Sequence, residues 1–388
     1  MSGTFNVMAS RDLEPKPTLH SRRSDRAGRS PSARLSALCA VAVATALVAA
    51  AAAQAKVVVV QRLESPQLAE IARASQPIVD TQIAKAAVSA AAPAGYWGGQ
   101  YQVSTGELVT IYASNSYPVD AALGQRWADF LASLIHGSEL STVTVLLATS
   151  EQISRTCGAD AVACYSARGE ELYTPGEDPA SDLSAEAVIT HEYGHHVAAN
   201  RSDAPWIALD YGPKRWASAM QVCAKARSGL LVPGAEDPVQ YTQNPGEGWA
   251  ETYRVLNERK SGRAETPWQI VDQALYPTAA ALTAAEQDVT APWTAGTATT
   301  QKAVLTQTKK TRTFTVATQL DGTLKMTLRP TAGMRLSVDV FASSTRAAHV
   351  VAARAVSRTF TVCGARSYRF RVTDLAGRGT VSLTVAKS

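Results

Sequence analysis

Cysteine and histidine are scarce in this 388-residue sequence, which has only five cysteines and six histidines. Cys39 lies near the N-terminus, and the spacing of the other four cysteines fits no cysteine-type zinc site. No long internal repeat is visible. Any metal site must therefore depend on the few histidines, three of which fall within residues 188–200, VITHEYGHHVAAN.

Acidic residues are also few at the N-terminus, where the first 34 residues carry seven Lys/Arg and three Asp/Glu. The uncharged run LSALCAVAVATALVAAAAAQA follows and ends in Ala53-Gln54-Ala55. A basic start, an apolar stretch and an A-x-A end are typical of a secretory signal peptide. We therefore predict an exported protein whose signal peptide, residues 1–55, is cleaved near Ala55. The alternative is a membrane anchor at residues 36–55, because about 20 apolar residues can span a bilayer.

Four cysteines remain after this leader, and an even number in an exported chain predicts disulfides. Cys157 and Cys164 bracket the short segment CGADAVAC, so we expect them to pair with each other. Cys223 and Cys363 then remain as the second pair by elimination, and that bond would tie two parts of the chain together.

Charge is distributed unevenly along the rest of the chain. Residues 296–388 hold fifteen Lys/Arg and three Asp/Glu, a net charge of +12, whereas residues 56–295 carry a net charge of −11. Opposite charge in a mature chain of about 330 residues indicates two domains. Either the two halves attract each other, or the basic half binds an anionic surface such as wall polymer or polysaccharide. We expect no nucleic-acid partner.

The pattern of apolar residues predicts an α+β domain over residues 96–295. It predicts strands at 106–114 and 141–150, a hairpin at 163–175, and helices at 120–137, 184–200, 213–229, 245–260 and 266–289. Residues 296–388 change to a period of two, with short strands at 312–319, 322–330, 334–343, 358–364, 366–374 and 379–386. This pattern predicts a β-sandwich. Residues 56–95 predict either a helical arm or a pro-segment, because Ser65-Pro66 can start a helix there.

His191-Glu192-Tyr193-Gly194-His195 forms an HExxH motif. On a helix, residues i and i+4 share one face, so His191 and His195 can present two imidazole nitrogens to one cation, with Glu192 placed to hold a water molecule. Apolar neighbours on both sides predict that this helix is buried, where two histidines need a partner. His196 points about 100° away from His195 and is expected to be packed or exposed rather than a ligand.

A third ligand is needed for a catalytic zinc site. The spacing HExxHxxGxxH is absent, because Ala198 and Arg201 occupy its glycine and histidine positions. Asp203 and Asp210 are possible ligands. The favoured candidate is Glu247, which lies in NPGEGWAETYR (residues 244–254) at the start of a second helix.

HEYGHH followed some fifty residues later by EGWAETY resembles the gluzincin type of zinc metallopeptidase, whose second helix reads E-x-x-A-E. The resemblance covers about residues 96–290 and implies a zincin-like catalytic domain. It implies that Glu247 is the third zinc ligand and that Glu251 supports a ligating histidine. The strands after residue 296 resemble the accessory sandwich domains of secreted bacterial peptidases.

The predicted activity is hydrolysis of peptide bonds in a peptide or protein substrate. Zn²⁺ would polarise the scissile carbonyl, and Glu192 would take a proton from the attacking water and pass it to the leaving amine. Tyr241, six residues before Glu247, is the candidate donor to the oxyanion, and Tyr253 is a lesser one. Trp216 and Trp249 are expected in the core.

Two alternatives remain open at this point. One is a non-catalytic wall- or glycan-binding exported protein with a structural zinc site, against which the retained Glu192 argues. The other is hydrolysis of a non-peptide amide by the same chemistry. Peptide deformylases also carry HExxH, but they use a cysteine ligand and are cytosolic, which fits neither the cysteine spacing nor the leader.

Overall fold

The computed structural model describes residues 92–388 except 160, 178–182, 238, 269 and 365. The predicted signal peptide and the arm or pro-segment up to residue 91 lie outside this range, as does Asp182. Within the described part of the chain, no helix has the length and apolar character needed to cross a membrane.

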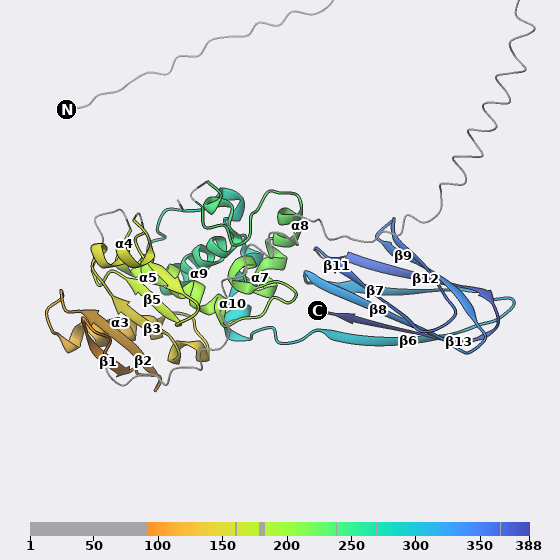
Figure 1. Cartoon of the computed structure of the whole chain (residues 1–388), viewed down its shortest axis with the longest axis horizontal. Helices are drawn as coiled ribbons and strands as arrows, with labels where there is room; N and C mark the ends of the chain where they lie inside the picture. Colours follow the sequence, from red (N-terminus) through yellow and green to blue (C-terminus); the bar gives the residue numbers. More distant parts are fainter. Residues whose placement is uncertain (1–91, 160, 178–182, 238, 269, 365) are drawn as a thin grey trace, which may run out of the picture. The chain divides into compact units, whose positions relative to one another are not determined.

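The first half is built on a five-stranded mixed sheet with the order β1-β2-β3-β5-β4 (Figure 1). Strands β2, β3 and β5 run parallel, while β1 and β4 pair antiparallel at the two edges. Their bounds are β1 Tyr96–Gln102, β2 Leu108–Ser114, β3 Thr144–Leu147, β4 Cys164–Ser166 and β5 Glu171–Thr174. The inner strands are apolar and buried, as expected for parallel strands covered by helices.

Helices surround this sheet and continue after it. Their bounds are α3 Ala121–Ser133, α4 Ser150–Cys157, α5 Ala185–Ala199, α6 Ala208–Tyr211, α7 Lys214–Ala219, α8 Val222–Arg227, α9 Pro245–Ser261 and α10 Ala279–Thr290. Short 3₁₀ turns are η1 Ser138–Ser141, η2 Tyr241–Gln243 and η3 Gln273–Leu275. One hydrophobic core joins the sheet to α3, α5, α9 and α10.

The two helices predicted to carry the site have the caps that their sequences indicate. The Ser184 side chain accepts a hydrogen bond from the Ala187 amide at 3.1 Å and starts α5. Asn244 does the same for the Gly246 amide at 2.9 Å, and Pro245 occupies the first turn of α9, where its missing N–H costs nothing. Both helices begin where predicted.

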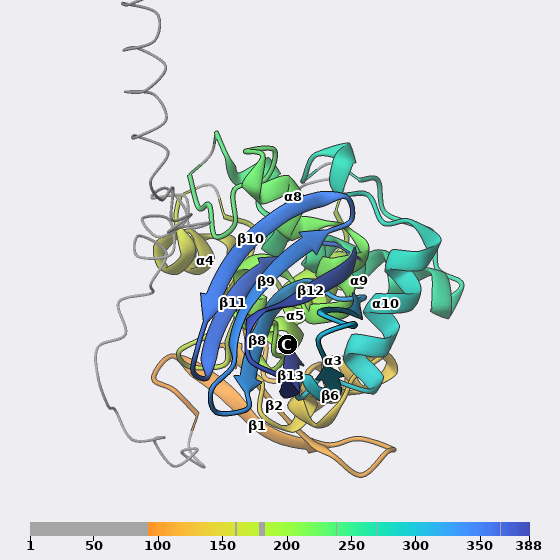
Figure 2. The same cartoon turned by 90° about the vertical axis from the view of Figure 1, so that its right-hand side faces the viewer.

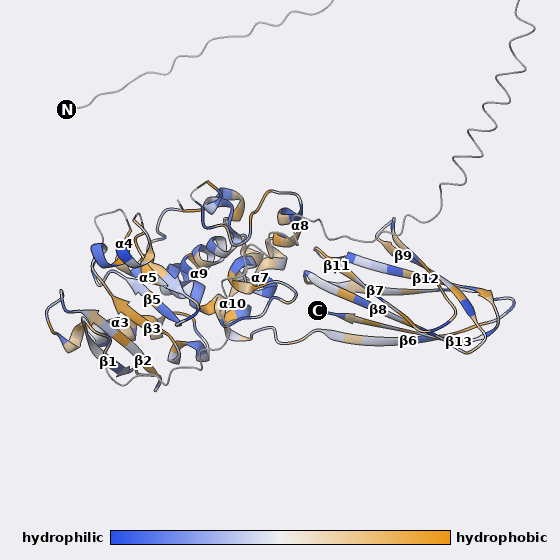
Figure 3. Ribbon diagram, viewed as in Figure 1, coloured by the Kyte–Doolittle hydropathy of each residue, from blue (hydrophilic) through white to orange (hydrophobic). Residues whose placement is uncertain are grey.

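The second half contains two four-stranded antiparallel sheets, ordered β10-β9-β12-β7 and β11-β8-β13-β6 (Figure 2). The strands are β6 Thr297–Leu305, β7 Thr311–Thr318, β8 Gly322–Pro330, β9 Arg335–Ala342, β10 Thr345–Ala352, β11 Val356–Val362, β12 Arg366–Ala376 and β13 Gly379–Lys387. Hydrophilic and hydrophobic residues alternate along these strands (Figure 3), and alternate side chains form a second hydrophobic core. This arrangement is consistent with a β-sandwich.

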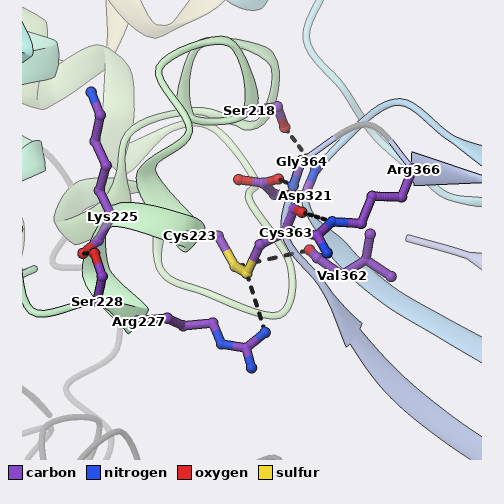
Figure 4. The surroundings of a disulfide bond; sticks show 10 residues. All are labelled: Ser218, Cys223, Lys225, Arg227, Ser228, Asp321, Val362, Cys363, Gly364 and Arg366. Atoms are coloured by element: carbon purple, nitrogen blue, oxygen red, sulfur yellow. Dashed lines mark hydrogen bonds between the residues drawn. A yellow bond between two sulfur atoms is a disulfide. The ribbon is translucent and has the colours of Figure 1, made fainter. Parts of the chain in front are cut away.

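Both predicted disulfides are present, Cys157–Cys164 and Cys223–Cys363. Cys223 lies on α8 and Cys363 directly follows β11, so the second bond links the helical part to the strands (Figure 4). Close by, the Asp321 amide donates to Ser218 Oγ at 2.8 Å. Two disulfides indicate an extracellular or otherwise oxidising environment.

Several predicted elements were wrong in extent. Residues 213–229 form two helices rather than one, because Gln221 adopts a left-handed conformation (φ 58°) between α7 and α8. Within 266–289 only the part from Ala279 is helical, following the separate turn η3. Strands β6 and β10 and helix α4 were not predicted.

Candidate metal centre

Helices α5 and α9 pack against each other closely at Gly194. A Cβ atom on Gly194 would lie 2.9 Å from the Cα of Ala250, so only glycine allows this approach of the two backbones. The indole of Trp249, fully buried as predicted, donates to the Gly194 carbonyl at 2.8 Å. The contact sets the separation of the two helix faces that carry the polar residues.

His191 and His195 on α5 face Glu247 on α9. The Oε2 atom of Glu247 lies 3.2 Å from His191 Nε2 and 3.3 Å from His195 Nε2. One ligand atom from each of the three residues can be chosen so that all lie within 4.8 Å of one another, and the group could hold a metal ion. The three side chains are almost wholly buried.

The spacing of these atoms suits a tetrahedral cation. Two ligand atoms bound about 2.0–2.1 Å from zinc at a tetrahedral angle are about 3.3 Å apart. The nitrogen–oxygen separations of 3.2 and 3.3 Å therefore match, and two neutral imidazoles with one carboxylate form a donor set that zinc accepts. Three protein ligands leave a fourth position open.

Glu251 lies one turn after Glu247 and contacts the other nitrogen of His191. Its Oε1 is 2.9 Å from His191 Nδ1, so the carboxylate orients the ring with Nε2 toward Glu247. Such a partner fixes the tautomer of a ligating histidine.

A buried arginine holds Glu251 in turn, and the sequence reasoning missed it. Arg254 donates from its NH2 group to Glu251 Oε2 at 2.6 Å and from its NH1 group to Glu258 Oε2 at 2.7 Å. Thr266 Oγ1 then donates to Glu258 Oε1 at 2.7 Å. The spacing E-x-x-R-x-x-x-E within 251–258 places all three side chains on one helical face and was the available signal.

Negative charge dominates the electrostatics of this group. Burial favours the neutral ring of His191, but its hydrogen bonds with Glu247 and Glu251 outweigh this and raise its pKa to about 10. Burial likewise opposes ionisation of Glu251, yet His191 and Arg254 lower its pKa to about 2. Without a metal the imidazole therefore holds a proton, which a cation would have to displace.

A cavity of about 660 Å³ opens over the three residues. Glu192, Tyr241 and Arg254 also line it, and the disulfide-closed segment 157–164 forms an apolar part of its wall. Glu192 is 8 % exposed and, within the described part of the chain, has no hydrogen bond or ion pair. Burial raises its pKa, while His191 and His195 favour its ionised form.

Tyr241 donates its hydroxyl proton to Glu247 Oε2 at 2.7 Å. Burial, followed by the charge of Glu247, raises the pKa of this phenol, which stays protonated and remains a donor at any working pH. The hydroxyl thus lies beside the open side of the three-residue group.

Some candidate residues lie elsewhere. Tyr253 is fully buried and donates to the Ile135 carbonyl at 2.6 Å, so its proposed role as an oxyanion donor was wrong. Asp203 is buried 3.4 Å from Lys214 Nζ, remote from the histidines. Asp210 lines the cavity but does not join the His-His-Glu group.

His196 is completely buried and packed, as expected. Its Nε2 lies 2.9 Å from the Glu139 carbonyl and its Nδ1 lies 3.1 Å from the hydroxyl of Tyr165. Trp216 is buried and donates to Thr252 Oγ1 at 3.1 Å. Both residues therefore stabilise the helices around the site and do not enter the cavity.

Comparison with known proteins gives little more. No protein-family model matches the sequence, and no curated protein matches it. Among solved structures, the chain is similar to the pre-peptidase C-terminal domain of a collagenase from Bacillus anthracis, with 20 % identity over 22 % of this chain and 87 % of that one. The TM-score is 0.21. A likeness of this size does not bear on the chemistry at residues 191–251.

Proposed function

We propose that this protein is an exported zinc metallopeptidase of the gluzincin type, with His191, His195 and Glu247 as the metal ligands. The observation that carries the proposal is the convergence of these three side chains from α5 and α9, at separations suited to zinc, beneath a cavity that Glu192 also lines. The close packing of the two helices at Gly194 supports a zincin-like domain.

Each nearby residue has a role in peptide hydrolysis. A zinc ion in this site supplies Lewis acidity, which polarises a carbonyl and makes water a better nucleophile near neutral pH. Glu192 accepts the proton of the attacking water and delivers it to the leaving amine, for which its burial and its freedom from other partners suit it. Tyr241 donates to the oxyanion, and Glu251 holds the ring of His191 in place.

The cavity favours a substrate chain over a small molecule. At about 660 Å³ it accommodates several atoms beyond a single amide group. Its wall changes from the apolar segment 157–164 to the carboxylates of Asp210 and Glu236, so neighbouring side chains of an extended peptide would meet different surroundings.

The test is metal content and peptide cleavage of purified protein, with and without Glu192→Gln. We expect about one zinc per chain in both proteins and a loss of cleavage of a denatured protein mixture by about 10²–10⁴-fold in the variant. Glu186→Gln, on the same helix but exposed and paired only with Arg263, is the matched control and should cleave as the wild type does. A wild type without zinc, or a Glu192→Gln protein that cleaves equally fast, would refute the proposal.

A further inference from the structure

The outer face of the sheet β10-β9-β12-β7 carries two aligned rows of polar and charged side chains. In the first row, Arg346, Phe341, Arg369 and Thr315 lie opposite one another on the four strands. In the second row, His349, Asp339, Arg371 and Thr313 do the same. Strands β10, β9 and β12 are seen side by side in Figure 2. We call this surface the arginine face.

Contacts between the rows hold the arginines in fixed positions. The guanidinium carbons of Arg369 and Arg371 lie 5.4 and 5.2 Å from the centre of the Phe341 ring. Arg371 also donates to Asp339 Oδ2 at 2.8 Å. A planar guanidinium stacked on an aromatic ring loses less freedom on binding an anion than a free side chain does.

Positive charge on the arginine face is in excess. Asp339 is its one carboxylate among the described residues, and it already has Arg371 at 2.8 Å, His349 at 2.8 Å and Arg346 at 3.6 Å. The three arginines nevertheless stay exposed, with side-chain exposures of 61 % for Arg346 and 50 % for Arg371. At least two positive charges remain available to an anion.

Hydroxyl groups lie beside the cations. Thr311, Thr313 and Thr315 are all exposed on β7, and the last two directly flank Arg371 and Arg369. The surface therefore combines guanidinium donors for carboxylates with a row of hydroxyls that can exchange hydrogen bonds with other hydroxyls. Nucleic acid, by contrast, is usually bound through several stacking aromatic rings, and Phe341 is enclosed by arginines.

We propose that the arginine face binds an acidic polysaccharide, a polymer that offers carboxylates and hydroxyls at regular intervals. Guanidinium groups of Arg369 and Arg371, about 7 Å apart along the strand, would bind carboxylates, and the threonine row would bind the sugar hydroxyls. This role is independent of the metal site, because none of its residues lines the cavity over Glu192. It would hold the enzyme on a carbohydrate-rich surface.

The other sheet offers a matched control. Its outer face carries Lys325 and Arg329 on β8, both exposed and without a salt bridge or aromatic contact among the described residues. Two substitutions there remove the same charge as two on the arginine face. Arg346→Gln with Arg369→Gln should spare the fold, since both side chains are exposed and Asp339 retains Arg371 and His349.

The experiment measures binding of the full chain to alginate, a polyuronate, at moderate salt. We expect wild type to bind alginate and not neutral dextran, the R346Q/R369Q protein to bind at least about tenfold more weakly, and the K325Q/R329Q protein to bind within about twofold of wild type. Equal weakening of both variants would overturn the proposal in favour of general attraction by net charge. Tighter binding to duplex DNA than to alginate, or no binding to alginate, would also overturn it.

Discussion

Glu251 Oε1 and His191 Nδ1 lie 2.9 Å apart, and this contact links the metal ligands to a buried chain of charged groups. Arg254 fixes Glu251, and Glu258 fixes Arg254, all within α9. The ring of His191 is thus oriented from outside the ligand set, which is typical of sites that bind a metal tightly.

Replacement of Glu251 should weaken metal binding without abolishing it. Glu251→Gln removes the negative charge behind His191 while keeping a hydrogen-bonding group of the same size, so zinc affinity should fall about 10–100-fold. Competition with a chromophoric chelator measures this directly. Glu186→Gln, exposed on α5, should leave the affinity unchanged. An unchanged affinity for Glu251→Gln would mean that the contact does not support the ligand.

The metal-free protein should be most stable between about pH 4.5 and 6.5. Glu251 has its pKa lowered from 4.5 to about 2, so the stability it contributes is present above pH 4.5 and lost as pH falls toward 2. His191 has its pKa raised from 6.5 to about 10, so its contribution is present below pH 6.5 and lost as pH rises toward 10. Each contribution is on the order of 3 kcal/mol at most.

Urea unfolding of chelator-treated protein across this pH range tests the window. Excess zinc should remove the alkaline loss, because the ligands bind metal in their deprotonated form. In Glu251→Gln the dependence should flatten on both sides. A wild-type stability that does not change between pH 6.5 and 9 without metal would contradict the expected pairing of His191 with the two carboxylates.

The identity of the third ligand predicts a clear difference between two carboxylates in the cavity. Glu247→Ala should lose zinc, since Oε2 of Glu247 lies 3.2–3.3 Å from both histidine nitrogens, whereas Asp210→Ala should keep it. Metal analysis after gel filtration measures both. Zinc lost from Asp210→Ala and retained by Glu247→Ala would assign the ligand to Asp210.

Local features made the two helices of the site predictable from sequence. Ser184 and Asn244-Pro245 are caps that act within a few residues, and the i, i+4 spacing of His191 with His195 follows from helix geometry alone. The facing of α5 and α9 also left a trace, since Gly194 and Ala250 are small where the backbones meet. That trace could be interpreted only once both helices were known.

Other features depend on contacts distant in sequence and left no such signal. The break between α7 and α8 occurs at Gln221, a residue that rarely adopts a left-handed conformation, so nothing in PKRWASAMQVCAKARSG marks it. Strands β6 and β10 are rich in threonine and alanine and lack a clear alternation, and their pairing with β13 and β9 defines them. The cavity wall at 157–164 likewise comes from tertiary packing.

Enlargement of Gly194 should separate the two helices and weaken the site. In Gly194→Val the new side chain would meet the backbone of Ala250, whose Cα is already 2.9 Å from the Cβ position, so unfolding free energy should fall by about 2 kcal/mol or more, with lower zinc affinity. Gly99→Val, where the Cβ position has no atom within 4 Å, is the control and should change stability by under about 0.5 kcal/mol. Equal stability of the two variants would contradict the close packing.

Tyr241 should act in catalysis rather than in metal retention. Its hydroxyl lies 2.7 Å from Glu247 Oε2 and remains protonated, so it can donate to an oxyanion that forms at the open side of the ligand group. Tyr241→Phe should lower kcat for peptide cleavage by about 10²–10³-fold while KM and zinc content stay near wild type. If the variant instead loses zinc, the hydroxyl serves to hold Glu247. If kcat is unchanged, the oxyanion donor must be sought among the other groups that line the cavity.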